Sequence, residues 1–79
     1  MPERILATSN LPTLRLGDNG EAVRLIQQLL VNFHGFSIQF NANFTQETQN
    51  AVKDFQGSHR LQVTGIVDRL TWRALGDKE

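Results

Sequence analysis

Two stretches of the sequence repeat each other, and their pattern decides the fold. Residues 40–52 read Phe-Asn-Ala-Asn-Phe-Thr-Gln-Glu-Thr-Gln-Asn-Ala-Val, and residues 63–75 read Val-Thr-Gly-Ile-Val-Asp-Arg-Leu-Thr-Trp-Arg-Ala-Leu. Each copy has an apolar residue, a short polar turn, an apolar anchor (Phe44 or Val67) and the pattern Thr-x-x-Ala-apolar. The repeat therefore predicts two loop-helix units of the same construction.

The start of each repeated helix is marked by a capping residue directly after the anchor. Thr45 and Asp68 carry side-chain oxygens that accept hydrogen bonds from the free N–H groups of a first helical turn. In both copies the Thr and Ala of the pattern recur with the helical period of three to four residues. We predict helices over about 45–58 and 68–75.

A longer helix precedes the repeat. Apolar residues fall on one helical face at Val23, Ile26, Leu29, Leu30 and Phe33. Asp18, followed three residues later by Glu21, has the form of a capping box, and Gly35 is a typical residue just after a helix end. These signals predict a helix over about 20–34.

Together the elements predict an all-α fold, a three-helix bundle in which two loop-helix pseudo-repeats pack on the longer first helix. The connector alternates apolar and polar residues over 36–40, which is the period of a strand, so we expect it to lie extended against the core. Residues 1–13 have no period and are expected to form an extended lead-in or linker. Residues 14–76 form the single domain and residues 77–79 a solvated end.

Composition excludes several classes of function. The chain has 79 residues and no Cys, so it has neither a disulfide nor a thiolate metal site. Eight basic and eight acidic residues cancel, whereas a nucleic-acid binder usually carries a basic excess. No apolar run approaches the length of a membrane span. The two histidines lack zinc spacing, so we expect no metal and no cofactor.

Catalysis is not expected either. Asp54, Ser58 and His59 have the residue types of a hydrolytic triad. Adjacent residues on a helix point about 100° apart, however, and a triad requires geometry rather than sequence proximity. The sequence also contains no readable pair of catalytic carboxylates. We predict that the chain is not an enzyme.

The ordered motifs resemble those of the peptidoglycan-binding domain family, small three-helix modules attached to bacterial cell-wall hydrolases. The family pattern combines Leu-x-x-Gly-x-x-Gly-x-x-Val-x-x-Leu-Gln, Asp-Gly-x-Phe-Gly-x-x-Thr-x-x-Ala-Val-x-x-Phe-Gln and Leu-x-x-Asp-Gly-x-Val-Gly-x-x-Thr-Trp-x-x-Leu. The matching residues are Leu14, Gly17, Gly20, Val23, Ile26, Gln27, Phe44, Thr48, Ala51, Val52, Phe55, Gln56, Leu61, Gly65, Val67, Thr71, Trp72 and Leu75. The resemblance covers nearly the whole chain.

The chain departs from this family pattern in its turns. The usual Asp-Gly is Asn41-Ala42 in the first copy and Thr64-Gly65 in the second. The glycine that usually closes the second helix is Arg60.

The resemblance implies a non-catalytic module that binds bacterial cell-wall peptidoglycan, through its glycan strand or its stem peptides. Such a module keeps an attached or partner catalytic hydrolase domain at its polymeric substrate. A protein–protein docking module on the same fold is the alternative. We expect a monomer with no nucleic-acid or membrane partner. The resemblance also implies an extracytoplasmic or cell-wall location as part of an exported protein, whose signal peptide is not in this sequence.

The candidate ligand-binding residues lie in the two loops and on the third helix: Asn41, Asn43, Gln46, Gln62, Thr64, Arg69, Trp72 and Arg73. Side-chain amides suit sugar hydroxyls and peptide groups, but Asn is also common in turns for backbone reasons. Arg69 and Arg73 share a helical face, which is either solvated or directed at stem-peptide carboxylates. Trp72 is either partial core or a stacking platform.

Overall fold

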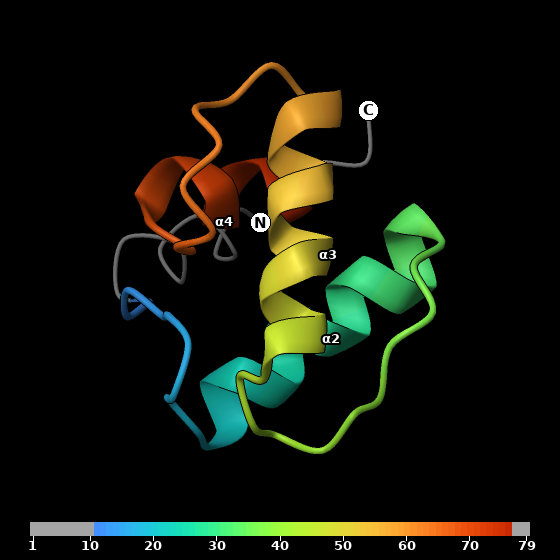
Figure 1. The fold of residues 1–79 in the computed structure, drawn as a ribbon, viewed down its shortest axis with the longest axis vertical. Helices are drawn as coiled ribbons and strands as arrows, with labels where there is room; N and C mark the ends of the chain where they lie inside the picture. The colour runs from blue at the N-terminus through green and yellow to red at the C-terminus, as the bar shows by residue number, and fades with distance from the viewer. Residues whose placement is uncertain (1–10, 77–79) are drawn as a thin grey trace, which may run out of the picture.

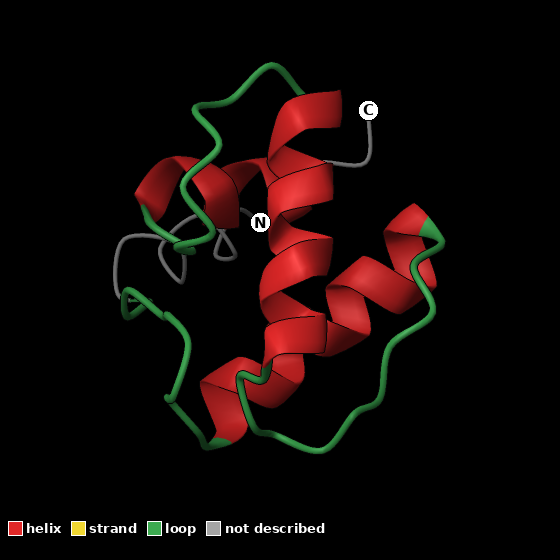
Figure 2. Cartoon of the chain, in the orientation of Figure 1, coloured by secondary structure: helices red, strands yellow, loops and turns green. Residues whose placement is uncertain are grey.

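The computed structural model describes residues 11–76, which form three α-helices. They are α2 (Glu21–His34), α3 (Gln46–Ser58) and α4 (Arg69–Gly76) (Figure 1). No strand occurs among these residues (Figure 2), which confirms the all-α fold. None of these helices has the length and apolar character that crossing a membrane requires. The end expected at 77–79 and most of the lead-in expected at 1–13 lie outside the described residues.

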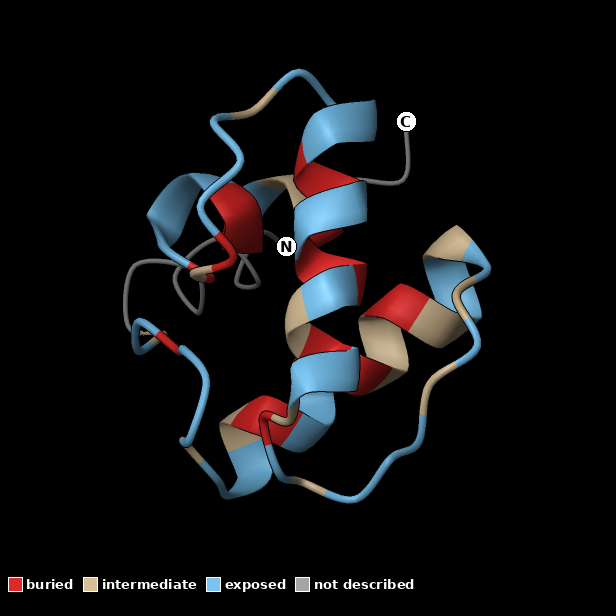
Figure 3. Cartoon of the chain, in the orientation of Figure 1, coloured by how far each residue is buried: buried red, intermediate tan, exposed pale blue. Residues whose placement is uncertain are grey.

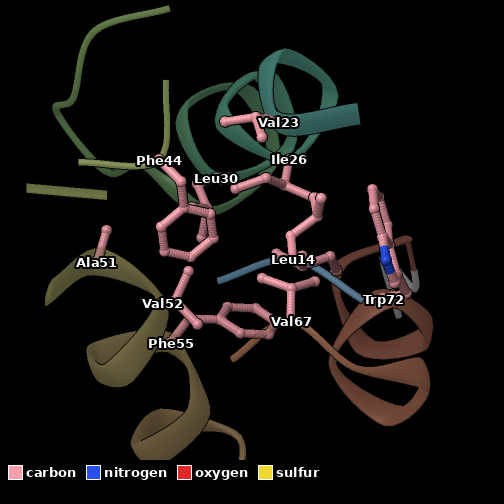
Figure 4. Close-up of a cluster of buried hydrophobic side chains, with 11 residues drawn as sticks. Leu14, Val23, Ile26, Leu30, Phe44, Ala51, Val52, Phe55, Val67 and Trp72 are labelled. Atoms are coloured by element: carbon pink, nitrogen blue, oxygen red, sulfur yellow. The ribbon is translucent and has the colours of Figure 1, made fainter. Parts of the chain in front are cut away.

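The helix α2 packs against both of the others, and the core lies where the three meet. In Figure 1, α3 crosses α2, and α4 lies beside the C-terminal half of α3. The buried apolar side chains form one cluster (Figure 4): Leu14, Val23, Ile26, Leu30, Phe44, Ala51, Val52, Phe55, Val67, Trp72 and Leu75. Burial of each such aliphatic or Phe side chain contributes about 1.5–3 kcal/mol to the stability of the fold, so this cluster stabilises a small domain that has no disulfide.

The helical period predicts most of the buried face of α2, with one error at its end. Val23, Ile26 and Leu30 are fully buried, as expected, and Leu29 is half-buried. Phe33, which was expected to point inward, is 48% exposed. It lies one turn beyond Leu29 on the edge of the buried stripe, where the apolar face of the helix passes out of the core.

Capping is as predicted at three helix ends and different at one. The Thr45 hydroxyl and the Asp68 carboxylate accept from the backbone N–H groups of Thr48 and Thr71, at 3.4 and 3.1 Å. Gly35 ends α2 in the left-handed conformation, with φ of 76°. The capping box at the start of α2 does not form. Its cap position is Gly20, without a side-chain bond.

Asp18, the expected cap of α2, instead closes a turn. Its carboxylate accepts from the backbone N–H of Arg15 at 2.9 Å. The Asp18 backbone N–H also donates to the carbonyl of Arg15, at 3.0 Å. This turn brings the chain into position to start α2 without a side-chain cap.

The segment 14–20 holds both repeated loops by backbone hydrogen bonds. Leu14 and Val67 exchange two bonds, at 3.0 and 2.8 Å. Further along, the Phe44 N–H donates to the carbonyl of Asp18 at 2.8 Å, and Gly20 donates to the carbonyl of Ala42 at 2.9 Å. The anchors Phe44 and Val67 thus lie on one continuous support, which fixes the two loops relative to each other.

The connector 36–40 does not form a strand, although its alternating pattern has the strand period. Phe36 and Ile38 are half-buried against the core, while Phe40 is 41% exposed. The bridges in the described residues are isolated pairs, Leu14 with Val67 and Asn19 with Asn43, so no partner runs alongside the connector. The alternation therefore marks the side of the loop that faces the core at Phe36 and Ile38, but not at Phe40.

Two positions at which the family pattern has glycine keep a glycine-like backbone without being glycine. Ala42 and Arg60 have φ values of 63° and 60°. Gly65, which corresponds to Ala42 in the second repeat, has φ of 78°. A left-handed conformation costs a residue with a Cβ atom roughly 1–2 kcal/mol, so the turn geometry is kept at a cost in stability.

We predict that Ala42→Gly stabilises the protein by about 1 kcal/mol. Glycine removes the strain of the positive φ, and the extra conformational entropy that it gives to the unfolded chain cancels only part of this gain. Urea unfolding of both proteins measures the difference. The matched control is Ala74→Gly in α4, which should destabilise the chain by about 1 kcal/mol. Equal destabilisation by both substitutions would contradict the strain at Ala42.

Candidate functional site

The turn before α3 is held by the side chain of Gln27, which is completely buried in α2. Its Nε2 group donates to the side-chain oxygens of Asn41 and Thr48, both at 3.1 Å, and to the carbonyl of Asn43 at 3.0 Å. Its Oε1 atom accepts from the backbone N–H of Ala42 at 3.0 Å. One amide therefore joins three segments of the chain.

The turn before α4 is held in the same way by Gln56, which is 1% exposed in α3. Its Nε2 group donates to the hydroxyls of Thr64 and Thr71, at 3.3 and 3.0 Å, and to the carbonyl of Ile66 at 3.0 Å. Its Oε1 atom accepts from the backbone N–H groups of Thr64 and Gly65, both at 2.9 Å. We call Gln27 and Gln56 the glutamine clamps.

The clamps correct one expectation about the repeat. If both repeats packed on the first helix in the same way, Thr48 and Thr71 would both face α2, and Thr48 does so through Gln27. Thr71 instead faces α3, through Gln56. The hydrogen-bonded unit that repeats is therefore a helix with its clamp, the turn after it and the Thr of the next helix, while both α3 and α4 pack on α2.

The clamps have a signal in the sequence, but aligning the two repeats with each other at a single spacing does not reveal it. Turns and Thr residues repeat at 23 positions, but the clamps lie 29 positions apart, at 27 and 56. Each clamp ends the pattern Val-x-x-apolar-Gln, in α2 from Val23 and in α3 from Val52. A glutamine on the buried face of an amphipathic helix, placed before a turn, indicates this arrangement, because a buried amide requires hydrogen-bond partners.

Three of the eight candidate binding residues have internal partners in the core or the clamps. The side chains of Asn41 and Thr64 accept from Gln27 and Gln56. Trp72 is 3% exposed, and its Nε1–H donates to the carbonyl of Pro12 at 2.7 Å. Figure 4 shows its ring at the edge of the core cluster, on the side of α4, and its low exposure leaves little of the ring open to solvent.

Four candidates have exposed side chains without a hydrogen bond or ion pair in the part of the chain that the structure describes: Asn43, Gln62, Arg69 and Arg73. Arg69 and Arg73 lie one turn apart in α4. Two unpaired guanidinium groups on one exposed face are able to bind carboxylates through two parallel hydrogen bonds each. The two Arg residues are thus brought together, as expected.

The remaining candidate, Gln46, belongs to a polar surface that the sequence reasoning missed. Its amide donates to Gln49 at 2.8 Å and to Asn50 at 3.1 Å on the exposed side of α3 (Figure 3). Lys53 continues this row one turn later, and we call Gln46, Gln49, Asn50 and Lys53 the α3 polar strip. Their spacing of three, four and seven residues was the available signal.

The α3 polar strip runs from the cap of α3 to the second clamped turn. Gly65 approaches it so closely that a Cβ atom there would lie 3.0 Å from Cε of Lys53 and 3.1 Å from Cγ of Gln49. The strip therefore borders the turn that Gln56 holds. The amides and the lysine on this surface are suited to sugar and peptide groups rather than to an apolar ligand.

This helical fold and its turns define a class of small binding modules, and sequence comparison identifies the family. The family model described as "Putative peptidoglycan binding domain" matches residues 19–75. The chain belongs to this family of peptidoglycan-binding domains.

Three similar proteins illustrate the relationship. A Bacillus subtilis (strain 168) protein described as "Uncharacterized protein FadG" is 32% identical over 68 residues, which is 82% of this chain and 12% of that protein. The crystal structure of the Burkholderia AP3 phage endolysin has a TM-score of 0.81 at 35% identity, covering 86% of this chain and 26% of that one. A fused Zn-dependent amidase/peptidase/peptidoglycan-binding domain-containing protein from Clostridium acetobutylicum ATCC 824 has a TM-score of 0.81 at 31% identity, covering 89% and 31%. This chain thus spans less than a third of each of these proteins.

We predict that Gln56→Leu destabilises the chain by about 2–4 kcal/mol. The substitution keeps a buried side chain of similar size but removes the partners of Gly65, Ile66 and Thr71, and each buried polar group left unpaired costs about 1–3 kcal/mol. Urea unfolding measures the loss. The control is Gln39→Leu on the exposed side of the connector, which should change stability by no more than about 0.5 kcal/mol. Equal effects at both positions would refute the role of the clamp.

Proposed function

We propose that this chain binds bacterial cell-wall peptidoglycan without catalysing a reaction, and that it keeps an attached or partner hydrolase at its polymeric substrate. Membership in the peptidoglycan-binding domain family is the observation that carries the proposal. The similar endolysin and amidase/peptidase structures, both much longer than this chain, support the second part. A wall ligand implies an extracytoplasmic or cell-wall location.

We further propose where the polymer binds. The two exposed arginines of α4, Arg69 and Arg73, would bind stem-peptide carboxylates, while Asn43, Gln62 and the α3 polar strip would bind sugar hydroxyls or peptide groups. All of these side chains are exposed except that of Gln49, which is half-buried, and the arginines have no ion-pair partner in the described residues. Asn41, Thr64 and Trp72 would act indirectly, by holding the turns and α4 in place.

The proposed surface offers few buried anchors, so its affinity for a single fragment should be low. Exposed charge pairs contribute only about 0.2–1 kcal/mol each. A tethered module does not need more than this. Once it is bound, the attached catalytic domain meets many bonds of the polymer at high effective concentration.

Sedimentation with insoluble peptidoglycan tests the proposal. We expect the chain to be retained on peptidoglycan but not on chitin or cellulose, and we expect retention to fall as salt is raised, because exposed charge pairs are screened over about 8–10 Å. Absence of retention at all protein concentrations tested would contradict wall binding and favour the docking-module alternative.

The arginine pair is tested by a charge-matched comparison. Arg69→Gln combined with Arg73→Gln should weaken retention about 2- to 30-fold, the loss of two exposed charge pairs, while leaving the melting temperature unchanged. The control, Arg24→Gln combined with Arg60→Gln, changes the net charge equally on other elements. If both double variants lose retention equally, only net charge matters and the α4 surface is not the site.

A further inference from the structure

Two histidines that are not among the proposed peptidoglycan-binding residues meet at a corner of the bundle where helix ends converge. His34 is the last residue of α2, and His59 is the cap residue after α3. Their ring centres are 5.4 Å apart, with the ring planes at 85°. Phe55 packs against both rings, at 4.8 and 4.1 Å.

Each imidazole contacts a backbone carbonyl through one ring nitrogen. Nε2 of His34 lies 3.1 Å from the carbonyl oxygen of Leu75 in α4, and Nδ1 of His59 lies 3.0 Å from that of Phe55. A carbonyl only accepts hydrogen bonds, so these two nitrogens carry the protons. In the neutral rings, the lone pairs are then on Nδ1 of His34 and Nε2 of His59.

This arrangement matches the way in which proteins prepare histidines to bind metals. A metal-bound imidazole almost always donates its other N–H to a carbonyl, carboxylate or water, which fixes its tautomer and orientation. Both rings already make this contact with a backbone carbonyl. The free nitrogens have no hydrogen-bond partner in the part of the chain that the structure describes.

Although the sequence spacing of the two histidines does not predict a metal site, we propose that His34 and His59 form a two-histidine site for a divalent transition metal such as Zn²⁺, bound by Nδ1 of His34 and Nε2 of His59. A zinc ion about 2.0–2.1 Å from a ring nitrogen is roughly 3.2 Å from the ring centre. At a tetrahedral angle, two such rings have centres roughly 5.2 Å apart. The observed separation of 5.4 Å fits this geometry.

The electrostatics of the corner also favour a cation. The C-terminal end of a helix carries partial negative charge. Three such ends meet at this pair, because His34 ends α2, His59 follows α3 and the ring of His34 contacts the Leu75 carbonyl of α4. Among residues 11–76, no group of three or more His, Cys, Asp or Glu side chains is placed to hold a metal. With two protein ligands among these residues, we expect water to complete the coordination and the metal to be exchangeable rather than required for folding.

Titration of the tag-free chain with ZnCl₂, followed by NMR of the imidazole nitrogens, tests this site. We expect one equivalent of Zn²⁺ to shift Nδ1 of His34 and Nε2 of His59 in parallel, and to raise the melting temperature. Mg²⁺, which prefers oxygen ligands, is the control and should shift neither nitrogen.

Variants separate a shared site from adventitious binding at a single ring. His34→Gln and His59→Gln should each lower the Zn²⁺ affinity at least about tenfold. His59 is exposed and does not join the helices, so His59→Gln remains informative even if His34→Gln weakens the fold. Unchanged affinity in His59→Gln, or shifts at one imidazole alone, would overturn the proposal. Peptidoglycan retention by these variants is expected to match the wild type, because neither histidine is among the proposed wall-binding residues.

Discussion

The structure depends on hydrogen-bond partners for the backbone polar groups of the turns that link its packed helices. In each turn, one glutamine amide from the preceding helix supplies such partners, because an amide both donates and accepts. Gln27 and Gln56 reach the turn backbone and the Thr of the next helix. No buried side-chain nitrogen or oxygen within residues 11–76 lacks a hydrogen-bond partner. The glutamine clamps thus set the path of the chain between helices.

This arrangement links the fold to the proposed function. The clamps and the segment 14–20 hold both turns, so the exposed residues beside them lie on a fixed framework although they belong to loops. A prearranged surface loses less conformational entropy on binding, which matters for a site made of exposed polar groups. The same framework explains why the turn conformation is kept at Ala42 despite its positive φ.

The sequence predicted the fold because apolar period, caps and turns agreed with one another. The helices lie within about one residue of their predicted bounds, and the caps Thr45 and Asp68 act as expected. The binding candidates were harder to judge, because sequence gives the chemistry of a side chain but not its partners. Asn41 and Thr64 look like surface residues until the clamps are seen. The exposure of Arg69 could be read from helix period, whereas the burial of Trp72 depends on packing between distant segments.

Amide hydrogen exchange tests the role of the glutamine clamps most directly. The backbone N–H groups of Ala42, Thr64 and Gly65 lie in loops, and their acceptors are the clamp side chains. We predict that these three amides exchange at least about 100-fold more slowly than unstructured peptide, while amides of residues 37–40 exchange rapidly. Exchange of all three at the rate of the 37–40 amides, while the helices stay protected, would contradict this prediction.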